Sequence, residues 1–112
     1  LPRMVGMSKA AEMIFTGDPI GAEDAYRWGL LSQLIPHEEL HERTMALARR
    51  IASGPPIAIR LAKLVMARSV DASLETSLEL AAASESITLT SEDHKEGLAA
   101  FLEKREARFT GR

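Results

Sequence analysis

Apolar residues recur at intervals of three and four along most of the chain, which is the spacing of one face of an α-helix. The clearest case is the C-terminal segment, where Leu98, Phe101 and Leu102 fall on one face. Ser91, or Thr90 before it, can cap the start of this helix through a side-chain oxygen. The pattern predicts one amphipathic helix followed by a basic tail.

The end of the chain is locally positive. From residue 103 onward the basic residues are Lys104, Arg105, Arg108 and Arg112, and the acidic ones are Glu103 and Glu106. Two interpretations fit this arrangement. The segment is either a docking helix with a solvated end or an edge that binds anions.

The same periodicity predicts five earlier helices, at about residues 5–16, 22–28, 38–53, 55–70 and 74–89. The fold class is therefore all-α, with about six helices. The one exception is an apolar run at residues 30–35, which reads as an extended segment because Pro36 disfavours helix just before it. This run is either an irregular connection or a strand whose partner lies outside the given sequence.

The helix at 74–89 carries two apolar stripes. Its members are Leu74, Leu78, Ala81 and Ala82 on one side, and Leu80, Ala83 and Ile87 on the other. Two stripes indicate packing against two partners. The helix is either the centre of a monomeric bundle or a contact with another subunit.

Composition narrows the function classes. The chain has 112 residues, a net charge of -2, 46% hydrophobic residues and no cysteine. These values are ordinary for one soluble globular domain and exclude nucleic-acid binding through a global basic field. No apolar run approaches the roughly 20 residues of a membrane-spanning helix. Without cysteine or a recognisable signal peptide, a cytoplasmic location is expected.

One motif suggests a metal. His37, Glu38 and His41 match H-E-x-x-H, which on a helix can hold zinc. We reject a zinc hydrolase because the motif directly follows Pro36, where helical geometry is least regular. No third ligand is apparent, and Thr44 stands where the extended motif needs glycine. No metal site is predicted.

Other catalytic signals are weak. Asp93 and His94 are expected in the solvated first turn of the last helix. Glu12 and Glu85 come nearest to carboxylates in apolar surroundings, but both read as polar-face positions. No catalytic residue is predicted, and no cofactor.

The order and spacing of several short motifs nevertheless resemble the enoyl-CoA hydratase/isomerase (crotonase) superfamily. These motifs are Leu1-Pro-Arg-Met-Val-Gly6, Ile14-Phe-Thr-Gly17, Ala22-Glu-Asp-Ala25, Trp28-Gly-Leu30, Ile35-Pro36, Leu40, Ala52-Ser-Gly-Pro-Pro56, Ala62-Lys63, Ser91-Glu-Asp93, Glu96-Gly97, Ala100-Phe-Leu-Glu-Lys-Arg105 and Arg108-Phe109. Each is weak alone, and together they are specific to the superfamily. Gly21 departs from it, since a Ser or Thr cap is more usual there.

The resemblance implies that residues 1–112 form the C-terminal helical domain of such an enzyme, the region that builds the trimer. The catalytic spiral core, with its glutamates and oxyanion-hole amides, would lie before Leu1. In CoA-binding relatives an aromatic residue and a lysine in the A-F-x-E-K-R segment approach the CoA moiety, and these match Phe101 and Lys104. On pattern alone, Phe101 could equally be a core residue and Lys104 a solvated charge.

The expected function is that of the family. The intact enzyme would hydrate trans-2-enoyl-CoA in fatty-acid metabolism, with acyl-CoA as its substrate, and would assemble as a trimer or hexamer. The 112 residues alone are expected to be inactive and to form a dimer or a helix-swapped oligomer. The alternative is a non-catalytic helical module that only self-associates.

Overall fold

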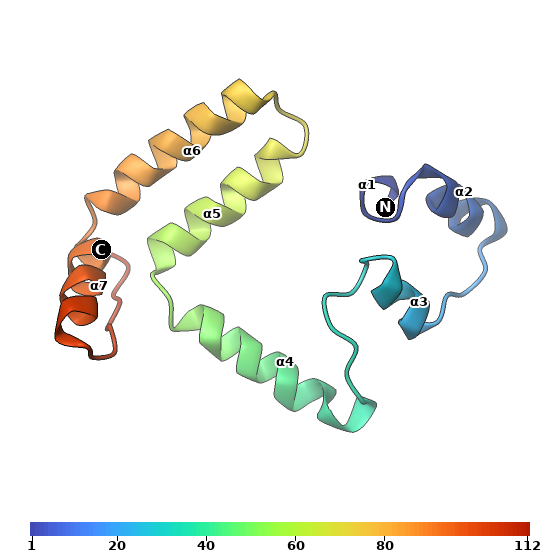
Figure 1. The fold of residues 1–112 in the computed structure, drawn as a ribbon, viewed down its shortest axis with the longest axis horizontal. Coiled ribbons are helices and arrows are strands. Elements are labelled where there is room, and N and C mark those ends of the chain that lie inside the picture. Colours follow the sequence, from blue (N-terminus) through green and yellow to red (C-terminus); the bar gives the residue numbers. More distant parts are fainter. The chain divides into compact units, whose positions relative to one another are not determined.

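A computed structural model describes residues 1–112 as seven helices without a strand, which confirms the all-α fold class. The helices are α1 (Pro2–Val5), α2 (Met7–Thr16), α3 (Ala22–Arg27), α4 (His37–Ala52), α5 (Pro56–Ser69), α6 (Leu74–Leu89) and α7 (Glu92–Glu103) (Figure 1). The chain divides into two compact units, residues 1–43 and 44–112. None of the helices is long and apolar enough to cross a membrane.

In the first unit, the helix predicted at about residues 5–16 is confirmed over Met7–Thr16, but its start differs from the prediction. Gly6 interrupts it with a backbone φ of 82° and separates α1 from α2. Glycine adopts this left-handed region without a Cβ clash, so the chain can turn there between two helices. Gly17, with φ 70°, ends α2, and its N–H donates to the carbonyl of Met13.

The apolar run at residues 30–35 is an irregular connection in this chain. The backbone N–H groups of Leu30 and Leu31 both donate to the carbonyl of Ala25, at 2.9 and 3.3 Å. Ala25 is buried in α3, so the start of the run is tied to that helix. The ammonium of Lys9 in α2 lies 4.5 Å from the ring centroid of Trp28, a cation–π contact that links α2 to the end of α3.

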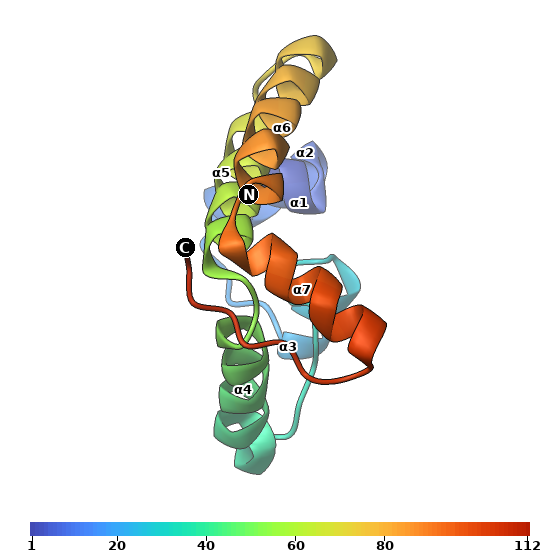
Figure 2. The same cartoon turned by 90° about the vertical axis from the view of Figure 1, so that its left-hand side faces the viewer.

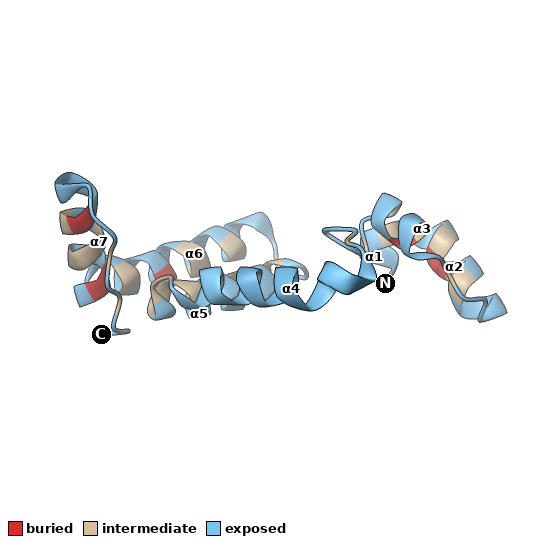
Figure 3. Cartoon of the chain, turned by 90° about the horizontal axis from the view of Figure 1, so that it is seen from below, coloured by how far each residue is buried: buried red, intermediate tan, exposed pale blue.

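In the second unit, α5 and α6 run side by side as an antiparallel hairpin (Figures 1 and 2). Ser73 caps α6, and its hydroxyl oxygen accepts the N–H of Thr76 at 3.1 Å. α4 crosses the boundary between the two units and buries no residue (Figure 3). Its apolar residues, which include Leu40, Leu47 and Ile51, are therefore uncovered in this chain.

The two stripes predicted on α6 are replaced by one partly buried face. This face consists of Ser77, Leu80, Ala81, Ser84 and Thr88. Leu74 and Leu78 remain 76% and 61% exposed. Helix α5 thus covers one side of α6, and Leu74 and Leu78 of one predicted stripe stay exposed.

The C-terminal segment is only partly helical. Ser91 caps α7 as predicted, and its hydroxyl oxygen accepts the N–H of His94 at 3.1 Å. The helix ends at Glu103, and the remaining residues fold back along it (Figure 2). We call residues 105–112 the return segment.

Asp93 holds the end of the return segment. Its carboxylate is 2% exposed and accepts the N–H groups of Thr110 and Gly111, at 2.6 and 2.9 Å. The carbonyl of Arg112 in turn accepts the N–H of Glu92 at 2.7 Å. The start of α7 and the end of the chain therefore satisfy each other's backbone groups.

We expect Asp93→Asn to lower the free energy of unfolding by about 1–3 kcal/mol, because hydrogen bonds to an ionised acceptor are strong and an amide nitrogen would face two donors. Urea unfolding followed by circular dichroism measures the change. Asp18→Asn is the matched control, since the side chain of Asp18 is exposed and makes no hydrogen bond. Equal stability of the two variants would contradict this role of Asp93.

Candidate functional site

The two residues predicted to contact CoA lie together at the C-terminal end of α7. Phe101 is in the last turn and its side chain is 80% exposed, so it is not a core residue of this chain. Lys104 follows the helix and is also exposed, and its ammonium makes no hydrogen bond or ion pair. Leu98 and Leu102, on the same face, are 55% and 70% exposed. The apolar face of α7 is thus uncovered and does not dock within the chain.

The backbone at Lys104 is unusual. Its φ of 55° and ψ of 40° are left-handed, and it is the only residue other than glycine with positive φ. The N–H of Lys104 donates to the carbonyl of Phe101, and the N–H of Arg105 donates to that of Ala100. This is the Schellman ending of a helix, in which glycine is the usual left-handed residue.

Arg105 is not a free cation. Its guanidinium contacts both carboxylate oxygens of Glu96, with Nη1–Oε1 2.6 Å and Nη2–Oε2 3.0 Å. Its Nε also lies 2.6 Å from Oε2 of Glu103. The anion-binding edge predicted from charge alone is therefore smaller than expected, because one of its four basic residues is neutralised within the chain.

Glu96 anchors the return segment electrostatically. The fork of Arg105, and then the backbone N–H of Arg108 at 2.8 Å, lower the pKa of Glu96 from 4.5 to about 2. The hydrogen bonds that Arg105 donates to Glu96 and to Glu103 raise the pKa of its guanidinium. Both groups are therefore charged at neutral pH.

Asp93 is the residue that sequence reasoning missed. An acidic residue in the first turn of a helix ordinarily indicates a favourable interaction with the helix dipole at the surface. Its burial depends on backbone groups seventeen and eighteen residues later, which no local pattern reveals. Glu12 and Glu85, the two candidates for buried carboxylates, are exposed as predicted.

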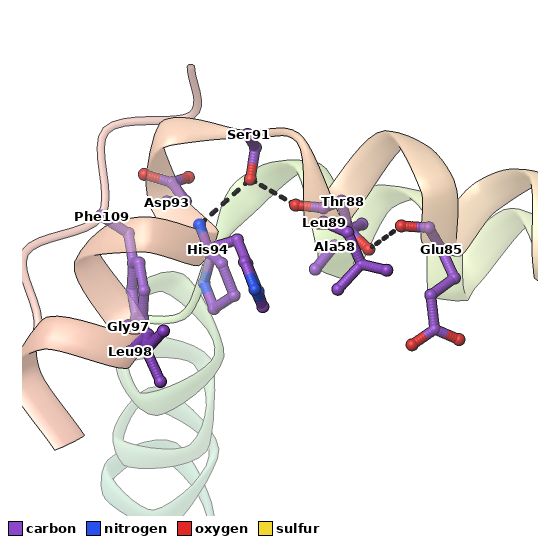
Figure 4. Close-up of a pocket in the computed structure, with 11 residues that line it drawn as sticks. Ala58, Glu85, Thr88, Leu89, Ser91, Asp93, His94, Gly97, Leu98 and Phe109 are labelled. Carbon is purple, nitrogen blue, oxygen red and sulfur yellow. Dashed lines mark hydrogen bonds between the residues drawn. The ribbon is translucent and has the colours of Figure 1, made fainter. Parts of the chain in front are cut away.

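A cavity of about 440 Å³ lies between the hairpin, α7 and the return segment (Figure 4). The ring of Phe109 covers Gly97, where an added Cβ would lie 3.5 Å from Cε1 of that ring. His94 lines the cavity but remains exposed, as predicted. No hydrogen bond joins its imidazole to a hydroxyl or a carboxylate, so the cavity holds no nucleophile–base pair.

The H-E-x-x-H motif occupies the first turns of α4. His37 and His41 are both exposed. No group of three or more His, Cys, Asp or Glu side chains in the chain is arranged to hold a metal ion. A zinc centre would need at least a third ligand from this set.

Comparison with known proteins decides the family. The sequence model of the enoyl-CoA hydratase/isomerase family matches residues 1–112, the whole chain. The chain belongs to this family. The resemblance seen in the sequence motifs is therefore confirmed.

Individual members of the enoyl-CoA hydratase/isomerase family are similar along nearly the entire chain. Crotonyl-CoA hydratase of Syntrophomonas wolfei is 35% identical over 97% of this chain and 42% of its own length. The 1,2-epoxyphenylacetyl-CoA isomerase of Escherichia coli is 33% identical over 100% of this chain and 43% of its own length. The crystal structure of enoyl-CoA hydratase from Bacillus anthracis superposes with a TM-score of 0.95 at 36% identity, over 99% of this chain and 43% of that one.

The chain thus spans about two fifths of the length of these relatives. Within the family, the 112 residues correspond to the C-terminal part. At the end of α7, the exposed ring of Phe101 and the unpaired ammonium of Lys104 occur together.

Acid should weaken the return segment through Glu96. Because folding lowers the pKa of Glu96 from 4.5 to about 2, its contribution to stability is complete above pH 4.5 and is lost as the pH falls towards 2. In Glu96→Gln we expect a smaller loss of stability over this range, measured as the urea midpoint at each pH. Glu92→Gln, which removes an exposed partner of Lys95, should keep the wild-type pH dependence. An unchanged slope in Glu96→Gln would disprove the assignment.

Proposed function

We propose that this chain is the C-terminal, CoA-contacting part of an enzyme that hydrates trans-2-enoyl-CoA. In this proposal Phe101 and Lys104 hold the CoA moiety, and the chain itself carries no catalytic residue. Support for the reaction class comes from family membership over residues 1–112. Support for the hydratase reaction in particular comes from the name of the relative in S. wolfei, a crotonyl-CoA hydratase.

The observation that carries the ligand proposal is the exposed end of α7. An aromatic ring that is 80% exposed costs free energy in water and gains it against a planar or apolar part of a ligand. An ammonium without a protein partner can pair with a phosphate. Phe101 lies in the last turn of α7 and Lys104 directly follows that helix, so both residues stand at the same end of α7. One CoA molecule could therefore meet both.

Hydration of an enoyl thioester needs groups that the 112 residues do not assemble. The water oxygen bonds to Cβ and a proton is added at Cα, so an acid–base pair must face the double bond and hydrogen-bond donors must face the thioester oxygen. Asp93 and Glu96, the carboxylates with the strongest contacts, are already bound to the return segment. We therefore propose that the chain binds without catalysing.

The alternative is a helical module that only self-associates. The observation in its favour is the extent of exposed apolar surface on the second unit. Large side chains that are at least half exposed include Leu74, Leu78, Ile87, Leu98, Phe101 and Leu102. Exposed apolar surface of this kind favours association, and it is compatible with CoA binding as well as with the alternative.

We expect the 112-residue chain to bind CoA weakly and to lose up to about 5-fold in affinity in Lys104→Ala, because an exposed charge pair contributes about 0.2–1 kcal/mol. Phe101→Leu should weaken binding by a similar factor through loss of the ring. Titration with CoA, followed by NMR shifts of the α7 amides, measures both. Added salt should weaken binding to the wild type more than to Lys104→Ala.

Matched control variants test whether CoA binding depends on Phe101 and Lys104 or on any exposed ring or lysine. Lys63→Ala removes an exposed lysine from α5, and Phe15→Leu removes a ring that is 84% exposed on α2. Both should bind CoA like the wild type. The same preparations should not hydrate crotonyl-CoA. Absence of CoA binding, or equal losses in the control variants, would refute the ligand proposal, and measurable turnover would refute inactivity.

We also expect the chain to form dimers or larger oligomers at high concentration, because the open face of α6 is apolar. Light scattering measures the mass. Leu78→Glu places a charge on the open face and should shift the population towards monomer, whereas Ser86→Glu, at an exposed polar position of α6, should not. A wild-type chain that is monomeric at every concentration would contradict self-association.

A further inference from the structure

Lys104 is held in a backbone conformation that its own side chain does not favour. A residue with a Cβ at φ 55° is strained relative to glycine, the usual residue at this point of a helix ending. Such a conformation persists only where the surrounding structure imposes it. Contacts on both sides of Lys104 must therefore supply the constraint.

The contacts before Lys104 come from the helix. Its N–H donates to the carbonyl of Phe101 at 3.3 Å, and the following N–H, of Arg105, donates to the carbonyl of Ala100 at 3.0 Å. Ala100 is 2% exposed, so this carbonyl belongs to a fixed part of α7. These two bonds close the last turn around Lys104.

The contacts after Lys104 come from one carboxylate. Glu96 receives the Arg105 fork at 2.6 and 3.0 Å and the backbone N–H of Arg108 at 2.8 Å. Residues 105 and 108 are therefore both fixed to the same side chain, two turns back on α7. Lys104 stands between this anchor and the closed last turn.

The charges at the end of α7 also distinguish Lys104 from its neighbour. Glu96 and Glu103 both contact Arg105 and neutralise its guanidinium, whereas Lys104 has no acidic partner. An anion that approaches the end of α7 therefore meets the Lys104 ammonium rather than the charge of Arg105. A planar, bidentate fork suits the anchoring role, because it fixes orientation as well as distance.

We propose that Glu96 and Arg105 are positioning residues, which hold Lys104 in its left-handed conformation so that its ammonium is presented to a CoA phosphate. This inference rests on the proposed function of Lys104. Glu96 and Arg105 do not contact the ligand in this scheme. They act only through the direction that they impose on the neighbouring residue.

The test is a double-mutant cycle on CoA affinity. Arg105→Lys keeps the positive charge but loses the fork, and we expect CoA binding about 3- to 5-fold weaker, no more than in Lys104→Ala. In the Lys104→Ala background the same substitution should have no further effect, because the residue that it positions is gone. Additive losses, or wild-type affinity in Arg105→Lys, would overturn the inference.

A spectroscopic readout distinguishes positioning from general loss of structure. A left-handed residue gives a strong NOE between its own N–H and Hα. We expect this NOE of Lys104 to weaken in Arg105→Lys and in Glu96→Gln, while the amide shifts of the first turns of α7 stay in place. Glu96→Gln provides the same test should Arg105→Lys fail to fold. A left-handed Lys104 retained in both variants would overturn the inference.

Controls separate this inference from the function on which it rests. Arg43→Lys, which alters an exposed pair with Glu39, should leave CoA affinity unchanged. If the wild type binds no CoA, or if Lys104→Ala binds it normally, the proposed function fails. If Lys104→Ala weakens binding and Arg105→Lys does not, only the positioning role fails.

Discussion

The second unit depends on two carboxylates of α7 that bind backbone from the end of the chain. Asp93 receives two N–H groups of the return segment, and Glu96 receives one more together with the Arg105 fork. Without them, residues 105–112 would have no regular secondary structure to satisfy their backbone groups. The carboxylates therefore decide where the chain goes after Glu103, and with it the surroundings of Lys104.

Binding of the return segment to α7 gives different surroundings to residues of the same type. Lys104 and Arg105 are adjacent cations at the end of a helix, where the helix dipole favours either one. The structure gives them opposite roles, since Arg105 is bound by Glu96 and Glu103 whereas Lys104 is unpaired. Phe101 and Phe109 differ in a similar way. Phe109 is partly buried against Gly97, and Phe101 is 80% exposed.

Sequence reasoning succeeded where local chemistry determines the outcome. The cap at Ser91 and the bounds of α6 follow from side chains or backbone preferences within a few residues. It failed at Gly6 because an isolated glycine inside a helical pattern can be tolerated or can break the helix. It failed at Asp93 because burial there depends on residues near 110, far along the chain.

The candidate site also combines features that the sequence predicts with features that it does not. Phe101 and Lys104 were found through family resemblance, because neither a lysine after a helix nor an aromatic residue in an apolar stripe signals a ligand by itself. What sequence could not predict is that the stripe stays uncovered and that Lys104 adopts a left-handed backbone. Glu96 and Asp93 bind the return segment to α7, through contacts that span 9 to 18 residues and that no local pattern reveals. The candidate site therefore lies at a chain reversal, and Phe101 and Lys104 stand where the helix stops.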